Sequence, residues 1–428
     1  MKRLVLVHTN DLHGRIDAIA RIATLVERVR DKEPDAQVVY ADAGDVEETT
    51  TRLSNLTKGV AMHGLLSAAG CQVACVGNAG WLRYGPQVIA DQARAARYPL
   101  LLANLEPVEG TQASTLVDGI GFVGVTDPFR DFLESGFDYG VRALDPVDVV
   151  RRAARELRAQ GARFVVCLSH LGLNEFPGGQ RPAFSDRDLA AALQGELDVV
   201  VGGHTHDLLP EGEWVGNVLV AQAGEYGQYL GRVDVDETGP RASVLAVSDE
   251  TPPHPAVLAE VERAEADLEA SLDEVVVELD APLDARWVAE MLRERMGAQI
   301  GLVTPANVLD RSLPPGRLRR RDLWEACHST ANPGVVELTG HQLLHLLARG
   351  RDPDFERSTS RILRGRPRGP LEVVGLPDEV DPAARYVVAS TDFELERYGG
   401  MVEDDWNLRV RYDFPTIVRE AIEERLAQ

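Results

Sequence analysis

The sequence of 428 residues lacks any run of about 18 apolar residues, which excludes a helix that spans a membrane. It also lacks the apolar core of a signal peptide, typically ~7–15 residues long, because the N-terminus MKRLVLVHTNDLHG has only about five apolar residues before a polar cluster. No small-residue cleavage site follows this cluster. We therefore expect a cytoplasmic protein with no membrane partner.

Cysteine is scarce in this chain. The four cysteines are too few for a disulfide scaffold in a protein of this length. Each lies among apolar residues, so we expect all of them to be thiols of the core. They are Cys71, Cys75, Cys167 and Cys327.

Basic residues are fewer than acidic ones. The 45 lysines and arginines face 68 aspartates and glutamates, which gives a net charge of −23 at pH 7. Such an excess of negative charge argues against a nucleic-acid polymer as partner. The composition, 44% hydrophobic and 26% charged, is otherwise that of a globular protein, and the length suggests two or three domains.

Short β-branched runs alternate with amphipathic stretches in the first half of the chain. Strands separated by helices predict an α/β sandwich with crossover connections. Sites in such proteins usually lie in the loops that follow the strands. We expect strands at residues 4–8, 37–41, 73–77, 164–169, 197–202 and 218–221, and helices at 16–30 and 60–69.

An amphipathic helix follows three prolines just after Thr251. Its apolar positions recur at spacings of three and four residues, as a helix requires. The opposite face is acidic, and we expect it to be solvated surface. The apolar positions are Val257, Val261, Ala264, Leu268 and Leu272, and the acidic ones are Glu260, Glu262, Glu265, Asp267 and Glu269.

We interpret residues 251–274 as a linker helix between a domain of residues 1–250 and a domain of residues 275–428. The second domain mixes both kinds of element, which predicts a further α/β fold. Its helices are expected at 287–296, 341–349 and 416–426, and its strands at 299–303 and 385–390.

Five segments of the first half place a metal-competent side chain just after an apolar run. The segments are HTNDLHG, AGDV, VGNAG, LSHLG and VGGHTHD. Carboxylate and amide oxygens with imidazole nitrogens, and no thiolate, suit Mn, Zn, Fe, Mg or a similar divalent ion. Seven ligands are too many for one tetrahedral ion and suit two metals that share a carboxylate. The candidates are Asp11, His13, Asp45, Asn78, His170, His204 and His206.

These segments resemble the calcineurin-like metallophosphoesterases, and within them the 5'-nucleotidase group. RLSNLTKG at 52–59, AQAGEYGQYLG at 221–231 and VVELTG at 335–340 extend the resemblance over nearly the whole chain. The resemblance implies a four-layer α/β/β/α sandwich with a second, smaller α/β domain. It also implies two divalent metal ions, with Mn or Zn favoured and Fe, Mg or Co possible.

The resemblance carries the metal roles over to individual positions. Asp11, His13, Asp45 and His206 look like ligands of the first metal, and Asp45, Asn78, His170 and His204 like ligands of the second, with Asp45 bridging. Asp45, Asn78 and His204 then act in catalysis through the metals. The reaction implied is hydrolysis of a phosphate ester by a metal-bound hydroxide.

The chain departs from the family pattern directly after Asn78. A histidine normally follows this asparagine, and an aspartate a few positions later orients it. Here Ala79 replaces the histidine, and Leu82 or Arg83 stands where the aspartate would be. The histidine's acid role is worth roughly 10²–10⁴ in rate. We therefore expect substrates with good leaving groups to be preferred, such as aryl phosphates, anhydrides or 2',3'-cyclic diesters. The alternative is that Arg83, Tyr84 or His63 substitutes for the acid.

The second domain departs from the pattern as well. In the family, a glycine-rich segment leads to an arginine that binds the substrate phosphate. Here LVTPANVL at 302–309 replaces that segment, so Arg311 takes the arginine's role only if the alignment is shifted in register. Asn332 is a second candidate substrate contact, but Met401 and Val402 follow Gly400 where ring-stacking residues would be expected. Two arginine-rich stretches are interpreted as surface ion pairs, or alternatively as ligands of a multiply charged anion. They are Arg311, Arg317, Arg319, Arg320 and Arg321, then Arg349, Arg351, Arg357, Arg361, Arg364, Arg366 and Arg368.

The prediction from sequence is a dimetal phosphoesterase that hydrolyses nucleotide-like phosphodiesters or activated monoesters. Its partner is then a small-molecule phosphate ester. Two alternatives stay open: a 5'-nucleotidase that uses a substitute acid, and a nearly inactive metal-binding scaffold that holds a nucleotide or a protein.

Overall fold

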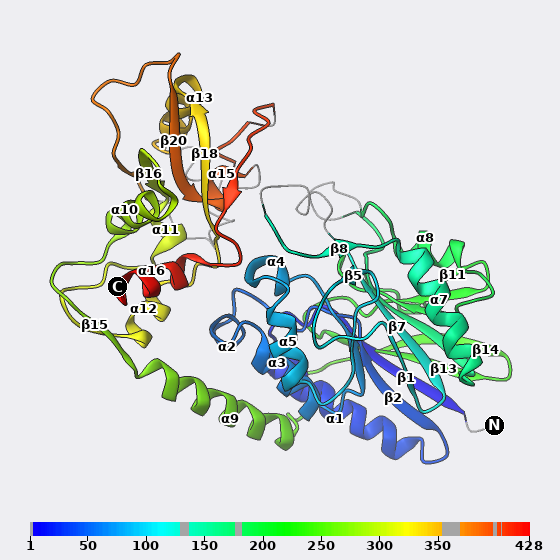
Figure 1. The fold of residues 1–428 in the computed structure, drawn as a ribbon. Coiled ribbons are helices and arrows are strands. Elements are labelled where there is room, and N and C mark those ends of the chain that lie inside the picture. Colours follow the sequence, from blue (N-terminus) through cyan, green and yellow to red (C-terminus); the bar gives the residue numbers. More distant parts are fainter. Residues whose placement is uncertain (1–2, 129–136, 176–181, 353–368, 397–399, 404) are drawn as a thin grey trace. The chain divides into compact units, whose positions relative to one another are not determined.

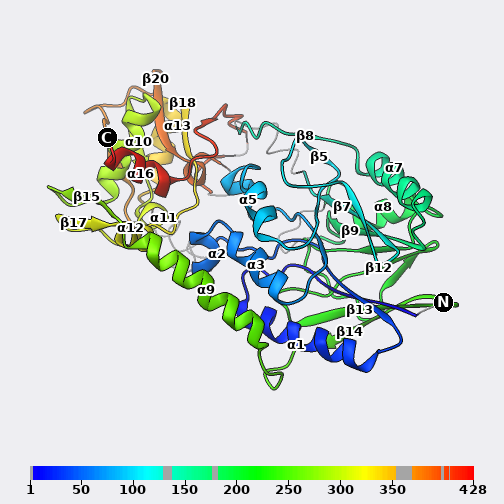
Figure 2. The same ribbon diagram turned by 60° about the horizontal axis from the view of Figure 1, so that its bottom comes forward.

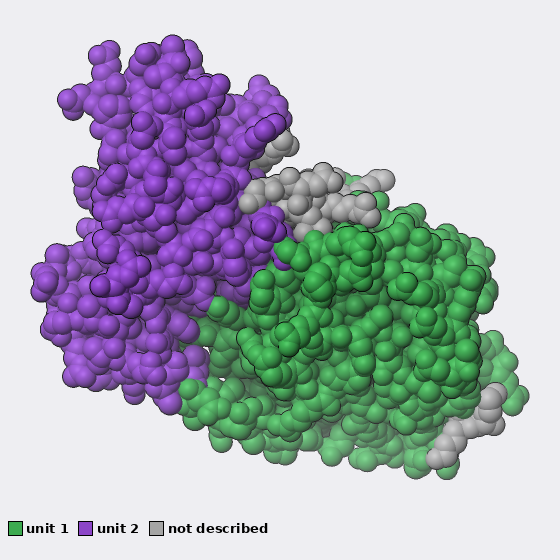
Figure 3. Space-filling model, viewed as in Figure 1, with its two compact units in different colours: residues 1–82, 86–128, 140–267 green, residues 83–85, 129–139, 268–428 purple. Residues whose placement is uncertain are grey.

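The computed structural model describes residues 3–128, 137–175, 182–352, 369–396, 400–403 and 405–428. They form two compact units, which Figure 3 colours separately. The first unit comprises Met1–Leu82, Pro86–Pro128 and Gly140–Asp267, and the second comprises Arg83–Gly85, Phe129–Tyr139 and Leu268–Gln428.

Two six-stranded sheets form the first unit (Figure 1). Both have a parallel centre; antiparallel strands extend one edge of the first sheet and both edges of the second. The first sheet has the order β14 (Gly239–Ala246), β13 (Tyr229–Asp236), β1 (Leu4–Thr9), β2 (Gln37–Asp42), β3 (Val73–Cys75), β4 (Leu100–Leu101). The second has the order β11 (Glu213–Val215), β12 (Val218–Ala221), β10 (Val199–Val201), β9 (Phe164–His170), β7 (Ile120–Thr126), β6 (Ser114–Val117).

The two sheets pack face to face through one apolar core. Alternation along β1 directs Leu4 and Leu6 toward this core, where they join Phe122 of β7 and Leu168 of β9. The other face of the second sheet packs against α7 (Pro146–Ala159) and α8 (Asp186–Ala192).

Helices on the other side of the first sheet complete the four layers. Figure 2 shows α1 and α3 on the opposite side of the sheets from α7 and α8. The predicted four-layer α/β/β/α sandwich is thus confirmed. The helices of this side are α1 (Ile16–Lys32), α2 (Arg52–Leu56), α3 (Val60–Ala68) and α5 (Val88–Ala95). Helix α4 (Trp81–Tyr84) begins in the first unit, and its last two residues belong to the second. A short pair of strands, β5 (Leu105–Glu106) and β8 (Arg142–Ala143), lies outside the two sheets.

The second unit is built on a five-stranded sheet. Helices α10, α12 and α16 share its apolar core. The sheet order is β19 (Glu372–Val374), β16 (Ile300–Val303), β20 (Arg385–Thr391), β18 (Pro333–Thr339), β21 (Arg411–Tyr412), and β15 (Val275–Leu279) pairs with β17 (Gly316–Arg319). The helices are α10 (Ala285–Met296), α11 (Pro305–Val308), α12 (Arg320–Ala326), α13 (Gly340–Arg349), α15 (Asp392–Leu395) and α16 (Val418–Leu426).

Helix α9 (Pro255–Leu272) occupies most of the predicted linker segment, and the division between the units falls within it. Its predicted apolar face is buried at Val257 and Leu272. The expectation that its acidic face is only solvated surface is wrong at Glu260, which is 8% exposed and paired with Arg263. The burial is possible because the neighbouring guanidinium compensates the charge.

All four cysteines are buried and unbridged, as predicted for thiols of the core. Burial also raises the pKa of each thiol, which keeps them in the neutral form. None of the described helices combines the length and the apolar character that a crossing of the bilayer requires.

Candidate metal centre

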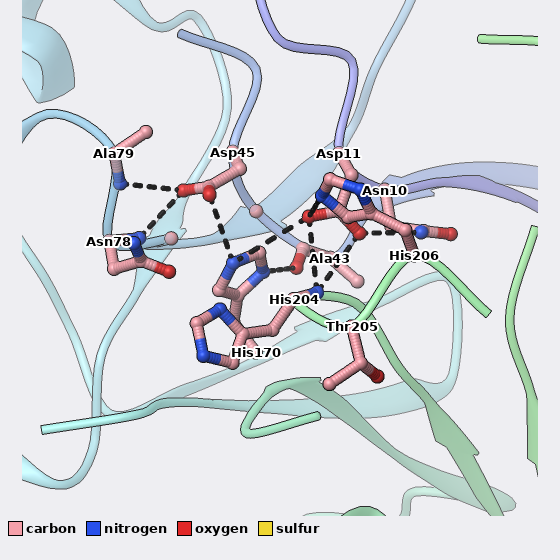
Figure 4. Close-up of polar contacts among 12 residues, drawn as sticks. Asn10, Asp11, Ala43, Asp45, Asn78, Ala79, His170, His204, Thr205 and His206 are labelled. Atoms are coloured by element: carbon pink, nitrogen blue, oxygen red, sulfur yellow. Dashed lines mark hydrogen bonds and ion pairs between the residues drawn. The ribbon is translucent and has the colours of Figure 1, made fainter. Parts of the chain in front are cut away.

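The parallel strands end at one edge of the two sheets, and the predicted ligands follow those ends. Asp11 and His13 come after β1, Asp45 after β2 and Asn78 after β3. His170 is the last residue of β9, and the loop after β10 carries His204 and His206. Figure 4 shows Asp11, Asp45, Asn78, His170, His204 and His206 gathered in one place.

One group of ligand atoms consists of Asp11, His13 and His206. The Nε2 atoms of His13 and His206 lie 3.1 Å apart. Asp11 Oδ1 lies 3.7 Å from the first of them and 3.5 Å from the second. These three atoms can therefore converge on one cation.

A second group consists of Asp11, Asp45 and His170. His170 Nε2 lies 3.2 Å from Asp45 Oδ2 and 3.8 Å from Asp11 Oδ1. Asp45 Oδ2 also lies 4.0 Å from His13 Nε2, so this carboxylate reaches toward both groups. The geometry suits two cations with carboxylate oxygens between them.

The other two predicted ligands are tied to these groups. The backbone N–H of Asn78 donates to Asp45 Oδ1 at 2.6 Å, and that of His204 donates to Asp11 Oδ2 at 2.9 Å. Asn78 Oδ1 is buried and accepts no hydrogen bond within the described part of the chain. A buried amide oxygen without a donor is costly, and a cation would satisfy it.

Five of the seven predicted ligands have a left-handed backbone. Positive φ angles are uncommon for residues other than glycine and tend to cluster at functional sites. The loops here therefore hold the backbone of these ligands in a conformation that such residues would not adopt by preference. The five are Asp11 (φ 50°), His13 (45°), Asp45 (57°), His204 (76°) and His206 (62°).

Two glycines allow the loops to approach this closely. A Cβ atom on Gly77 would overlap Asp45 Oδ1, and one on Gly203 would lie 2.9 Å from His170 Nδ1. The glycines that precede Asn78 and His204 thus leave space for the neighbouring ligands.

Two of the histidines have close partners on their Nδ1 atoms. His206 Nδ1 lies 2.5 Å from Glu225 Oε2, and His170 Nδ1 lies 2.7 Å from the Ala43 carbonyl oxygen. Such partners fix the tautomer and leave Nε2 as the ligand atom. Sequence reasoning missed the role of Glu225, although GEYG was among the segments that carried the resemblance.

The site is strongly charged without cations. Burial lowers the pKa of His170, but the Asp45 carboxylate outweighs this effect and raises the value to about 10. Burial raises the pKa of Asp45, but His170, His13 and the Ala79 N–H together hold it well below its usual range. A cation at Nε2 would replace the proton of His170, so metal binding and protonation compete here.

Ala79 presents only a methyl group where the resemblance implies a histidine, and its N–H donates to Asp45 Oδ1 at 2.9 Å. Two of the predicted substitute acids are engaged elsewhere. His63 is buried and its Nδ1 lies 2.8 Å from the Tyr98 hydroxyl, while Arg83 pairs with Asp392 within the second unit. The third, Tyr84, is 5% exposed.

The predicted substrate contacts in the second unit differ in exposure. Arg311 is exposed, whereas Asn332 is fully buried, and its Nδ2 donates to the Thr416 carbonyl at 2.9 Å. A substrate role for these two residues stays a prediction.

Four of the described arginines in the two arginine-rich stretches form ion pairs. Arg319 and Arg321 pair with Asp273, Arg320 with Glu274 and Glu423, and Arg349 with Glu403. These contacts agree with the interpretation as surface ion pairs. Arg357, Arg361, Arg364, Arg366 and Arg368 lie outside the described residues.

Comparison with known sequences gives two family matches. The calcineurin-like phosphoesterase family matches residues 4–208, and the 5'-nucleotidase C-terminal domain matches residues 283–403. An uncharacterized metallophosphoesterase of Bacillus subtilis is 25% identical over 100% of both chains. A trifunctional nucleotide phosphoesterase protein of the same organism is 25% identical over 81% of this chain and 27% of its own length.

Among solved structures, a 5'-nucleotidase precursor from Thermus thermophilus has the same fold. The TM-score is 0.58 at 22% identity, and the alignment covers 99% of this chain and 96% of that one. The chain belongs to the calcineurin-like phosphoesterases that carry a 5'-nucleotidase C-terminal domain, a family of metal-dependent phosphoric ester hydrolases.

Proposed function

We propose that this phosphate ester hydrolase acts on nucleotide-like phosphodiesters and activated phosphomonoesters, with Mn or Zn as its two cations. The family supplies the reaction class. The observation that carries the finer proposal is Ala79, whose side chain cannot donate a proton at the position after Asn78.

The donor set supports two divalent cations. It combines carboxylate oxygens, an amide oxygen and imidazole nitrogens without any thiolate, a set that Mn and Zn both accept. The buried Asn78 Oδ1, which accepts no hydrogen bond from the described residues, is an atom that such an ion would satisfy. Two cations supply a nucleophile at neutral pH and neutralise charge that builds on phosphoryl oxygens.

The chain's own groups hold this arrangement before substrate binds. Asp45 accepts the N–H groups of Asn78 and Ala79, so its Oδ1 is occupied and its Oδ2 faces His170. Asp11 is fixed in the same way by the N–H of His204. Preorganisation of this kind holds the two carboxylates in place, so they need no reorganisation at the moment of reaction.

The leaving group decides which substrates react quickly. An alkoxide such as a nucleoside 5'-oxygen needs a proton, and the methyl group of Ala79 cannot donate one. A phenolate departs without a proton, and a strained cyclic diester is driven to open. We therefore expect these substrates to outrun ordinary 5'-monophosphates by roughly the 10²–10⁴-fold that a general acid contributes.

The test is a panel of four substrates with the manganese-loaded protein: bis-(p-nitrophenyl) phosphate, p-nitrophenyl phosphate, 2',3'-cyclic AMP and 5'-AMP. The expected order of kcat/KM places 5'-AMP last. The matched control is Asp45→Asn, which should lose bound manganese and turnover together.

Two outcomes would contradict this proposal. Hydrolysis of 5'-AMP as fast as of the aryl esters would indicate a nucleotidase with a substitute acid. Retention of two manganese ions without turnover of any substrate would indicate a binding protein.

A further inference from the structure

We propose that Arg15 is a substrate-binding residue, which holds a phosphoryl oxygen at the edge of the metal centre and favours dianionic over monoanionic phosphates. The inference rests on the proposed function for its substrate class. The position of Arg15, the fixed ring beneath it and its unpaired charge support the assignment.

Arg15 directly follows the segment that carries His13. It is the residue before α1, and its guanidinium carbon lies 4.6 Å from the centroid of the Tyr226 ring. That ring lies 5.6 Å from the ring of His13 and 5.8 Å from that of His206. The Tyr226 ring is therefore a common neighbour of the Arg15 guanidinium and of two histidines of the first ligand group.

Tyr226 is a fixed platform. Its N–H donates to the carbonyl oxygen of Asp11 at 2.7 Å, and its backbone has a φ of +55°. Since non-glycine residues rarely adopt this conformation, the hydrogen bond to a metal-ligand residue fixes the backbone from which the ring projects, and the ring itself contacts His13 and His206. Arg15 is thereby positioned relative to the metal ligands.

The charge of Arg15 is available for a ligand. Its side chain is exposed, and within the described residues no carboxylate lies within 4.0 Å of it. Arg21, on the same helix, is by contrast hydrogen-bonded to the carbonyls of Asp249 and Thr251.

The two carboxylates beside Tyr226 face the histidines and not Arg15. Glu225 Oε2 lies 2.5 Å from His206 Nδ1. Glu48 Oε2 lies 3.6 Å from His13 Nδ1, and its Oε1 accepts the N–H of Thr50 at 3.0 Å. An unpaired cation beside an acidic site in a protein of net charge −23 attracts an anion locally.

The stacked arrangement suits a phosphate. A guanidinium over an aromatic face is attracted by the ring, and it keeps its N–H edge free for oxygen acceptors. Two parallel N–H groups match two phosphate oxygens, and the attraction grows with the charge of the phosphate. A monoester dianion should therefore gain more from Arg15 than a diester monoanion.

The experiment compares Arg15→Gln with the wild type on two substrates that share one leaving group, p-nitrophenyl phosphate and bis-(p-nitrophenyl) phosphate. We expect kcat/KM to fall about 10–100-fold for the monoester and less than tenfold for the diester. Affinity for inorganic phosphate, measured by calorimetry on the manganese-loaded protein, should fall with the monoester value. Arg15→Lys should restore part of both losses because it keeps the charge but not the fork.

Arg28→Gln is the matched control, because it removes an exposed arginine from the same helix α1. It should leave both substrates and phosphate affinity unchanged. Equal kcat/KM and equal phosphate affinity in Arg15→Gln and the wild type would overturn the proposal. Loss of bound manganese in Arg15→Gln would also overturn it, since the residue would then support the metal site itself.

Failure of the proposed function gives a different result. If the wild type turns over none of the substrates, calorimetry with inorganic phosphate still tests Arg15 directly. Weaker phosphate binding by Arg15→Gln then supports the assignment, and unchanged binding overturns it.

Discussion

Asp186 is a buried carboxyl group outside the ligand set. It is fully buried at the start of α8, and its Oδ1 accepts a hydrogen bond from the Ser169 hydroxyl at 2.5 Å. Its Oδ2 has no hydrogen-bond partner within the described part of the chain. Burial raises the pKa of Asp186 to about 8, an effect that the Ser169 hydroxyl only partly offsets.

This pKa makes stability depend on pH. The native carboxyl keeps its proton up to about pH 8, whereas the unfolded one loses it above about pH 4. The unfolded state binds fewer protons over this interval, so the free energy of unfolding falls as pH rises through it. From pH 5 to pH 8, we expect the free energy of unfolding of Asp186→Asn to rise by a few kcal/mol relative to that of the wild type. Urea unfolding at both pH values measures the difference.

The exposed Asp35→Asn serves as the control for loss of one carboxylate, and its effect should be the same at both pH values. If Asp186→Asn also shifts stability equally at pH 5 and pH 8, then Asp186 is ionised in the folded protein. Burial would then not be what sets the protonation state of this carboxyl group.

Single residues were partly predictable. Residue type and position after an apolar run indicated all seven candidate ligands, because oxygen and nitrogen donors are visible in the sequence. The left-handed backbone of Asp45 and His204 was not predictable, since propensities disfavour it for both. Arg15 and Tyr226 were missed because a cation over a ring has no pattern along the chain.

Pairing between strands places one histidine against one glycine. His8 of β1 lies opposite Gly231 of β13, and a Cβ atom on Gly231 would overlap the His8 ring. His8 is 1% exposed, so its ring has little room to move. We expect Gly231→Ala to lower the free energy of unfolding by more than about 2 kcal/mol, through overpacking at a rigid sheet position.

A double-mutant cycle checks this prediction. His8→Ala removes the ring that the new methyl group meets, so it should cost much less in the Gly231→Ala background than alone. Additive effects of the two substitutions would show that the ring and the methyl group do not compete for space.

Elements with a clear period were predictable to within a few residues. β2 (Gln37–Asp42), α10 (Ala285–Met296) and β16 (Ile300–Val303) lie where their patterns indicated. The paired strands β13 and β14 were not predicted, because apolar and polar residues alternate along only part of each strand. Glu260 was misread because it packs against Gly64 of α3, where an added Cβ atom would lie 2.7 Å from its Oε1, and the sequence of one helix does not show such a contact with a distant segment.

The division of the protein into two units does not follow the chain. Residues 83–85 and 137–139 precede the linker helix, yet they belong to the second unit. The Phe137 ring stacks on Tyr412 with centroids 3.9 Å apart, and Tyr139 lies 4.3 Å from Phe414. No composition shift marks these segments, because a short stretch with two aromatic residues resembles any loop.

This arrangement predicts how a fragment behaves. A chain ending at Asp267 retains Phe137 and Tyr139, which are 4% and 2% exposed in the full chain, but lacks the aromatic residues that cover them. We expect the fragment to bind a hydrophobic dye such as ANS and to associate at micromolar concentration, because an uncovered apolar patch promotes both. Size-exclusion chromatography and dye fluorescence, with the full chain for comparison, measure this.

The matched fragment carries Phe137→Ser with Tyr139→Ser, which removes the patch without changing the first unit elsewhere. It should be monomeric, bind little dye and retain the manganese content of the full chain, since all seven candidate ligands precede residue 268. If the unsubstituted fragment is already monomeric and binds no dye, the two aromatic side chains do not depend on the second unit for their burial. The boundary would then lie at the linker helix alone, as the sequence suggests.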